Sequence, residues 1–123
     1  MKKWISSEYQ ECKAYYAWAQ YNPILREYLY KIVNEGKRSS ASGFFLKLIG
    51  MRAGLPDYHL PVPNGTYHGL WLEMKRKNQK KVTKRENQTE WLDKLNKIGH
   101  YATFAYGAEN AIQITLDYIN NRI

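Results

Sequence analysis

The chain has 123 residues, of which 44% are hydrophobic and 24% charged, a balance that predicts one folded domain and excludes an intrinsically disordered protein. Its formal net charge of +8 favours a polyanionic partner, although a basic protein that binds no polyanion could carry the same charge. The one cysteine, Cys12, excludes an internal disulfide and a cysteine-based zinc cluster, and no segment is apolar enough for a signal peptide or a membrane span. We therefore expect a cytoplasmic protein without a membrane partner.

The first predicted element is a helix over residues 8–20. Ser6 and Ser7 are suitable N-cap residues, and Asn22-Pro23 ends the helix because proline cannot continue it. At about 100° per residue, apolar and aromatic side chains gather on one face of this helix. The face that we predict to be buried consists of Cys12, Tyr15, Tyr16 and Ala19.

The rest of the chain alternates strands and helices. Hydrophobic periodicity and turn residues predict strands over 29–33, 57–62, 67–75 and 101–106, and helices over 41–51, between Thr83 and Gly99, and over 108–120. The predicted core faces of the last two helices consist of Trp91, Leu92, Leu95 and Ile98, and of Ile112, Leu116 and Ile119. This order predicts an α/β fold, in which residues 1–123 form one domain with a central mixed β-sheet flanked by helices.

Three polar side chains on the hairpin that the predicted strands 57–62 and 67–75 would form carry the candidate chemistry. Glu73 and Lys75 are two residues apart on a strand and therefore share a face, while the residues that alternate with them face the core. Glu-x-Lys is also common on an ordinary solvated strand face, but here Asp57 can return beside Glu73. Two carboxylates can hold a divalent cation, and a lysine beside them can stabilise an anionic transition state.

The register of this hairpin decides whether the two carboxylates meet. Asn64-Gly65 is a strong turn signal, and a two-residue turn there would place Asp57 opposite Leu72, pointing away from Glu73. A three-residue loop or one bulge would instead place Asp57 directly opposite Glu73. Two prolines before the turn cannot donate ladder hydrogen bonds, which favours an irregular end. An active site at these residues therefore predicts that the hairpin is not a tight two-residue turn.

The motifs around these residues resemble those of the VRR-NUC family, the virus-type replication-repair nucleases of the PD-(D/E)xK superfamily. The chain looks most like the short stand-alone members carried by phages. The matching residues are Asn34-Glu35-Gly36-Lys37-Arg38, Gly50-Met51-Arg52-Ala53-Gly54-Leu55-Pro56-Asp57, Leu72-Glu73-Met74-Lys75, and Gln88 with Trp91-Leu92 before Gly99. With the N-terminal helix, the resemblance covers nearly the whole chain. It implies a restriction-endonuclease-like fold and metal-dependent cleavage of DNA.

The resemblance also implies a role for each hairpin residue. Asp57 and Glu73 would bind Mg²⁺ or Mn²⁺, with the backbone carbonyl of Met74 as a further oxygen ligand. Lys75 would orient or activate the attacking water. The metal would polarise the scissile phosphate, while Lys75 would offset the charge that develops on it.

Two further side chains are candidate members of the active site. The family has a glutamate on its first helix, which is Glu8 or Glu11 here. We prefer Glu8 because it lies near the centre of the predicted buried face, where an acid needs a partner such as a metal or a lysine. The alternative is a surface acid favoured by the helix dipole. The resemblance makes Gln88 a polar lining of the site, near the attacking water or Lys75, and a cap at the core edge is its structural alternative.

The segment from Lys75 to Arg85 is basic and contains no acid. Charge runs are often solvated loops, but beside a nuclease site we expect contact with phosphates, which weakens as salt rises. The candidate DNA-binding residues are Arg38, Arg52, Lys77, Lys80, Lys81, Lys84 and Arg85.

The leading hypothesis is a metal-dependent DNA endonuclease. The resemblance implies branched substrates such as Holliday junctions and a homodimer that brings two sites to two strands, in the cytoplasm of a bacterial host if a phage encodes the chain. The alternative is a non-catalytic DNA-binding module on the same fold. Cleavage of RNA is a third hypothesis that the motif chemistry leaves open.

Overall fold

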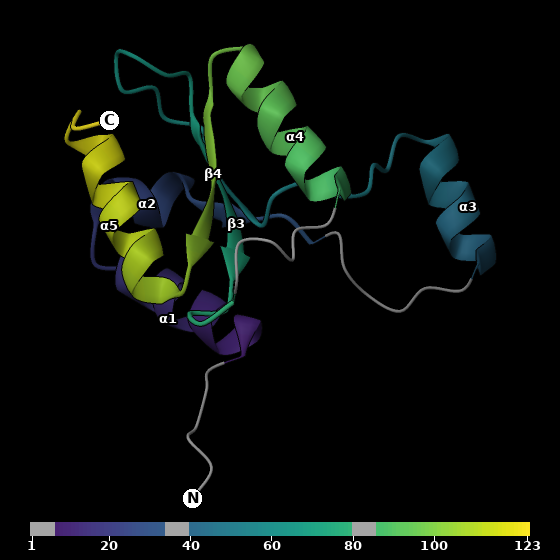
Figure 1. The fold of residues 1–123 in the computed structure, drawn as a ribbon, viewed down its shortest axis with the longest axis horizontal. Helices are drawn as coiled ribbons and strands as arrows, with labels where there is room; N and C mark the ends of the chain where they lie inside the picture. The colour runs from purple at the N-terminus through teal and green to yellow at the C-terminus, as the bar shows by residue number, and fades with distance from the viewer. Residues whose placement is uncertain (1–6, 34–39, 80–85) are drawn as a thin grey trace, which may run out of the picture.

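The structure, a computed structural model, describes residues 7–33, 40–79 and 86–123 (Figure 1). Its helices are α1 (Glu8–Ala19), α2 (Pro23–Tyr28), α3 (Ser40–Leu48), α4 (Glu86–Lys97) and α5 (Ala108–Ile119). Its strands are β1 (Tyr30–Lys31), β2 (Tyr58–Leu60), β3 (Leu70–Lys75) and β4 (Tyr101–Tyr106). Within these described segments, no helix has the length and apolar composition needed to cross a membrane.

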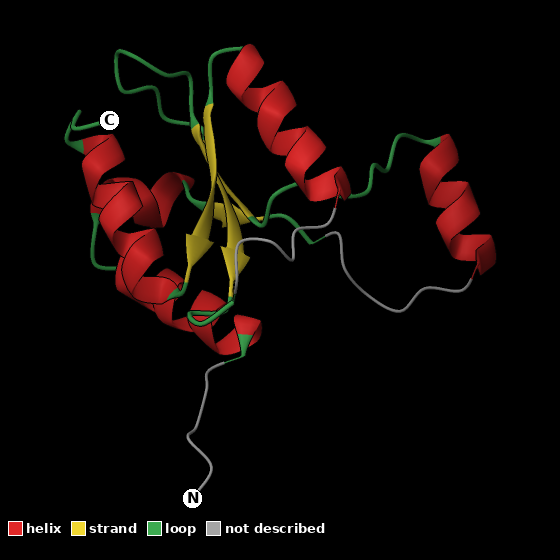
Figure 2. Cartoon of the chain, viewed as in Figure 1, coloured by secondary structure: helices red, strands yellow, loops and turns green. Residues whose placement is uncertain are grey.

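The strands form one mixed sheet in the order β1-β2-β3-β4. The pairs β1–β2 and β2–β3 are antiparallel, whereas β3 and β4 are parallel along their whole length. A parallel pair needs a crossover connection, and α4 lies in the connection between β3 and β4. The predicted α/β fold with a central mixed sheet flanked by helices is therefore confirmed (Figure 2).

Helices cover both faces of the sheet (Figure 1). Helices α1 and α5 pack on one face and α4 on the other, while α3 stands apart from the sheet. The larger core lies between the sheet and the pair α1 and α5, and its most buried side chains include Tyr15, Leu72, Met74 and Tyr118. The smaller core beneath α4 consists of Leu92, Leu95, Ala102 and Phe104. The alternation in β3 therefore sends Leu72 and Met74 to the larger core, as predicted.

The predicted elements are present, but β1, β2 and β3 are all shorter than predicted, and α2 was missed. Asn22-Pro23, which we interpreted only as a helix end, is also a helix start. The side-chain oxygen of Asn22 accepts the N–H groups of Ile24 at 2.9 Å and Leu25 at 3.1 Å, and Pro23 occupies the first helical position. The serine cap of α1 is Ser7, which forms a capping box with Gln10.

The predicted buried faces of the helices are partly wrong. In α1, Tyr15 and Ala19 are fully buried, but Tyr16 is 38% exposed and Cys12 is half-buried. In α4, Ile98 lies beyond the end of the helix and is exposed. The most buried side chains of α5 are Ala108, Ala111, Thr115 and Tyr118, whereas Ile112, Leu116 and Ile119 are half-buried. Small residues let α5 approach the sheet closely, so its larger aliphatic side chains flank the contact line.

The register between β2 and β3 is the one that brings the carboxylates together. The paired residues are Tyr58 with Leu72, His59 with Trp71, and Leu60 with Leu70. One further step along this register sets Asp57 opposite Glu73. The connection is the loop 61–69, in which Asn64 accepts backbone N–H groups from Thr66 and Tyr67, and not a two-residue turn. The prediction that the hairpin is not a tight turn is therefore confirmed.

Candidate active site

A hydrogen bond joins the carboxylate of Asp57 to strand β3. Asp57 directly precedes β2 and is buried, and its Oδ2 accepts the backbone N–H of Met74 at 2.7 Å. Met74 stands between Glu73 and Lys75, so this bond brings the carboxylate to the Glu-x-Lys motif. The structure thus gathers Asp57, Glu73 and Lys75 where β3 ends.

The side chains of Glu73 and Lys75 are buried, at 2% and 6% exposure. Their interpretation as an ordinary solvated strand face is therefore wrong. Both alternate with the core residues of β3 and share the face on which α4 packs, and the Lys75 Nζ lies 5.7 Å from the centre of the Phe104 ring. Burying charged groups is costly, and such groups cluster at functional sites more often than in purely structural strands.

Lys31 belongs to the same cluster, and the sequence analysis missed it. Its Nζ lies 3.1 Å from Oδ1 of Asp57, so this ion pair adds a positive charge beside the carboxylates. The contact forms because β1 pairs with β2 and sets Lys31 opposite Tyr58, the residue after Asp57. The alternation of strand 29–33 predicted a strand but gave no sign of its partner, which lies 26 residues away.

The donor atoms here fit a hard divalent cation. Asp57 and Glu73 offer carboxylate oxygens, which Mg²⁺ and Mn²⁺ prefer over nitrogen and sulfur ligands. A carboxylate oxygen has two lone-pair sites, so Oδ2 of Asp57 can accept the Met74 N–H and still bind a cation. Within the described segments, no three His, Cys, Asp or Glu side chains are grouped to hold a metal ion. Backbone carbonyls and water could complete the ligand set around the two carboxylates.

The reason for preferring Glu8 to Glu11 was wrong. Glu8 is exposed, whereas Glu11 is buried with Tyr15 and Ala19. Oε1 of Glu11 accepts the backbone N–H of Ala108, the first residue of α5, at 3.2 Å. The partner of the buried acid is thus a helix N-terminus, whose N–H groups and positive dipole end favour a carboxylate.

The other predicted site residues are described in part. The backbone of Gln88 lies in the first turn of α4, but its side chain is outside the described part of the structure. Arg52 and Lys77 are exposed, and the guanidinium of Arg52 lies 5.1 Å from the centre of the Trp91 ring. The predicted DNA-binding residues outside the described segments are Arg38, Lys80, Lys81, Lys84 and Arg85. Thr83, at the predicted helix cap, also lies outside them.

The fold is restriction-endonuclease-like, with a mixed sheet between helices and a buried carboxylate–lysine cluster at a strand end. No protein-family model and no curated protein matches the sequence. Among solved structures, the chain matches one named VRR_NUC domain protein, with a TM-score of 0.78 and 25% sequence identity over 95% of this chain and 91% of that one. This likeness confirms the fold and supports the resemblance to the VRR-NUC family, while the phage-type and superfamily assignments stay predictions.

Proposed function

We propose that this chain is a metal-dependent DNA endonuclease, with residues 1–123 forming one VRR-NUC domain of the PD-(D/E)xK superfamily. The observation that carries the proposal is the burial of Glu73 and Lys75 beside the carboxylate of Asp57. A strand that only had to pack would carry apolar side chains at these positions, because buried charges are costly to desolvate. The likeness to a solved VRR_NUC domain protein and the net charge of +8 support a nuclease that acts on a polyanion.

In this proposal, Asp57 and Glu73 hold Mg²⁺ or Mn²⁺, with the backbone carbonyl of Met74 as a third oxygen ligand. When bound, the ion would polarise the scissile phosphate and lower the pKa of a coordinated water. The ammonium group of Lys75, fixed on β3, offsets the negative charge that develops on the phosphate. Gln88, at the start of α4, positions the attacking water.

The first helix carries two glutamates in different surroundings. Glu8 stays a candidate catalytic residue, because its exposure leaves the carboxylate accessible to water, metal or substrate. Glu11 is instead engaged at the start of α5. The DNA backbone would be held by Arg38, Arg52, Lys77, Lys80, Lys81, Lys84 and Arg85.

We infer that the substrate is branched DNA, such as a Holliday junction, and that the active form is a homodimer in the cytoplasm, of a bacterial host if a phage encodes the chain. Helix α3 supports a dimer, because it stands apart from the sheet and its aromatic residues Phe44 and Phe45 are 59% and 64% exposed (Figure 2). Leu48, at the end of the helix, is 66% exposed. Exposed apolar surfaces of this kind mark sites of protein association.

The proposal is tested by incubating a DNA junction, a linear duplex and an RNA of matched sequence with the protein and Mg²⁺ or Mn²⁺. Asp57→Asn and Glu73→Gln keep the size of the side chain but remove its charge, so each should slow cleavage by roughly 10²- to 10³-fold. Asp93→Asn and Glu27→Gln make the same chemical changes at exposed positions and should cleave like the wild type. Cleavage retained in both site variants would refute the assignment.

Calorimetry separates this proposal from the alternative of a non-catalytic DNA-binding module. A nuclease of this type should bind Mn²⁺ in the wild type and bind it far more weakly in Asp57→Asn. Tight DNA binding with no measurable binding of a divalent metal would favour the binding module instead.

A further inference from the structure

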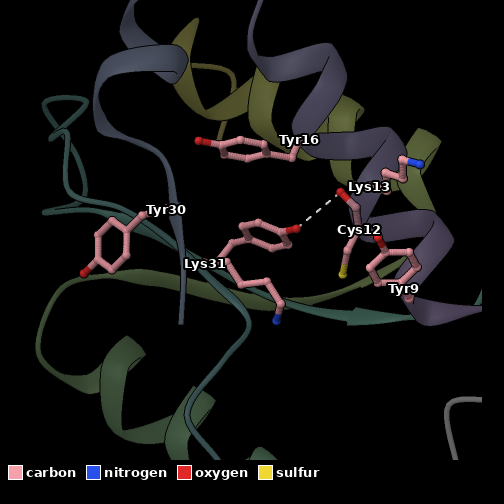
Figure 3. Close-up of a pocket in the computed structure, with 7 residues that line it drawn as sticks. Tyr9, Cys12, Lys13, Tyr16, Tyr30 and Lys31 are labelled. Carbon is pink, nitrogen blue, oxygen red and sulfur yellow. Dashed lines mark hydrogen bonds between the residues drawn. The ribbon is translucent and has the colours of Figure 1, made fainter. Parts of the chain in front are cut away.

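A cavity of about 370 Å³ opens beside the candidate active site, within the size range of small-molecule and cofactor sites (Figure 3). We call it the tyrosine pocket. Tyr16 lies along one side of it and Lys31 along the opposite side, with Tyr9 at one end, while the ring of Tyr30 points away from these side chains. The pocket is lined by Tyr9, Cys12, Lys13, Tyr16, Tyr30, Lys31 and Tyr58.

One wall of the tyrosine pocket is a second face of helix α1. Its residues Tyr9, Cys12, Lys13 and Tyr16 follow the three- and four-residue spacing that places side chains on one side of a helix. This face is distinct from the buried face of α1, and its two tyrosines are 72% and 38% exposed. Both rings therefore present surface that a ligand could cover.

Tyr58 forms the floor of the pocket, and contacts with the core fix its ring. Tyr58 is 2% exposed, its ring lies edge-on to that of Tyr15 at 5.1 Å, and its hydroxyl donates to the backbone carbonyl of Cys12. The hydroxyl of Tyr30 shares a 2.6 Å hydrogen bond with Nδ1 of His59, which holds that ring on the opposite face of β1 from Lys31. Tyr58 is thus a rigid floor with almost no exposed surface, and the exposed aromatic rings that a ligand can reach in the pocket are those of Tyr9 and Tyr16.

The pocket can bind a ligand but offers no nucleophile of its own. Burial raises the pKa of the Cys12 thiol to about 11, and its hydrogen bond with Tyr58 lowers that pKa by less. The thiol is therefore neutral near pH 7, and a neutral thiol is a poor nucleophile. Tyrosine rings and lysine ammonium groups remain the chemistry available to a ligand.

Lys31 connects the pocket with the carboxylates. Its Nζ lies 5.5 Å from the centre of the Tyr58 ring in the pocket and 3.1 Å from Oδ1 of Asp57 in the candidate active site. Tyr58 and Asp57 are also consecutive residues. A group bound in the pocket would therefore lie close to the metal ion that Asp57 and Glu73 would hold, and so to a phosphate bound by that ion.

We propose that the tyrosine pocket binds one unpaired nucleobase of the strand that reaches the candidate active site. This inference rests on the proposed function and narrows its substrate class to DNA that has an unpaired nucleotide beside the cleaved phosphate, as at a flap, a gap or a frayed branch point. Aromatic rings stack on the face of any base, while Lys13 and Lys31 supply positive charge for the flanking phosphates. A base within an intact duplex is stacked on its neighbours and would first have to be extruded.

The binding test uses fluorescence anisotropy with a labelled oligothymidylate of about ten nucleotides, in EDTA so that no cleavage occurs. Removing both exposed rings by Tyr9→Ala with Tyr16→Ala should weaken binding by about 5- to 140-fold, the range expected for lost stacking on one base. The double variant with phenylalanine at both positions keeps the rings and should bind within about twofold of wild type. The matched control is Tyr21→Ala with Tyr28→Ala, at two exposed tyrosines outside the pocket, which should also bind like the wild type.

A strand of equal length and charge that lacks all its bases shows whether the pocket contacts bases or only the backbone. The wild type should bind this abasic strand more weakly than oligothymidylate, and the double alanine variant should lose most of that preference. An unchanged preference in the double alanine variant, or equal binding of both strands by the wild type, would overturn the inference.

Cleavage then separates this inference from the proposed function. With metal, the double alanine variant should lose cleavage of a flap in proportion to its loss of binding. If the double alanine change did not affect flap cleavage, base binding by the tyrosine pocket would be refuted while the proposed nuclease activity would stand. No cleavage by the wild type, with the preference for bases intact, would overturn the proposed nuclease and leave the pocket as a base-binding site.

Discussion

The buried acid on helix α1 allows a sharp test of stability, through replacement of Glu11 by alanine. Glu11 is 8% exposed, and its Oε1 accepts the N–H of Ala108 at 3.2 Å. Gly107 is the N-cap residue of α5 and provides no side-chain cap, so Glu11 supplies from another helix what a cap residue supplies locally.

The expected loss follows from the two interactions that Glu11 makes with the start of α5. A lost N-cap hydrogen bond costs about 0.5–2 kcal/mol, and a lost charge at a helix N-terminus costs a further 0.3–1 kcal/mol or so. Glu11→Ala should therefore lower the free energy of unfolding by about 1–3 kcal/mol. Glu11→Gln keeps an oxygen acceptor and loses only the charge, so it should cost about 0.3–1 kcal/mol.

Urea denaturation at neutral pH, followed by circular dichroism, measures these differences as shifts of the midpoint at constant slope. The matched control is Glu8→Ala, an exposed glutamate one turn earlier on the same helix, which should change stability by no more than about 0.5 kcal/mol. If Glu8→Ala destabilised the fold as much as Glu11→Ala does, a cap by Glu11 could not be the explanation.

Two further predictions concern the histidines and glycines at the opposite end of β3. Burial, and to a smaller extent the charge of His100, lowers the pKa of His59 from 6.5 to about 4. Between pH 6.5 and pH 4, the unfolded chain therefore binds a proton at this residue that the folded chain does not. The free energy of unfolding should therefore fall by about 1–2 kcal/mol as pH drops from 6.5 to 4, a value reduced because the ring is partly exposed. His59→Gln should flatten this fall in urea titrations at several pH values. Parallel curves of stability against pH for the variant and the wild type would contradict the assignment. Gly99→Ala should destabilise the fold by more than about 1 kcal/mol, because its φ is +98° and the new Cβ would lie 2.5 Å from Cδ2 of His68. Gly43→Ala, where no atom lies within 4 Å of the new Cβ, should be neutral or stabilising by thermal melting, and equal effects of the two changes would count against this strain.

The β2–β3 register could be predicted because it depends on parity. A strand alternates its side chains, so one extra residue in the connection moves Asp57 from one face to the other. Asp57, Glu73 and the turn signal lie within a short stretch of sequence, and the observed pairing is the one that sets the two carboxylates opposite each other. The local turn signal left two registers open, and the requirement that the two carboxylates meet selected the observed one.

Which face of α1 is buried could not be predicted from its residue pattern. Its aromatic residues lie on more than one side, so periodicity alone gives no unique buried face. Tyrosine is amphipathic and tolerates both burial and exposure, as Tyr15 and Tyr16 show at adjacent positions. The buried face of α1 contacts residues far along the chain, such as Ala108, 97 residues after Glu11, and only the assembled fold brings these residues together.

The cap on α5 also links the first helix to the candidate catalytic lysine. Gly107 donates its N–H to the carbonyl of Lys75 at 2.9 Å, and the next N–H, that of Ala108, goes to Glu11. A side chain at Gly107 would lie 3.2 Å from the Cβ of Lys77 and 3.3 Å from Oε2 of Glu11, and the φ of +89° there also favours glycine. The end of β3, the start of α5 and the buried face of α1 are thus joined through consecutive backbone groups. Glu11 therefore helps to hold the start of α5, and the residue before that helix, Gly107, is hydrogen-bonded to the backbone of Lys75.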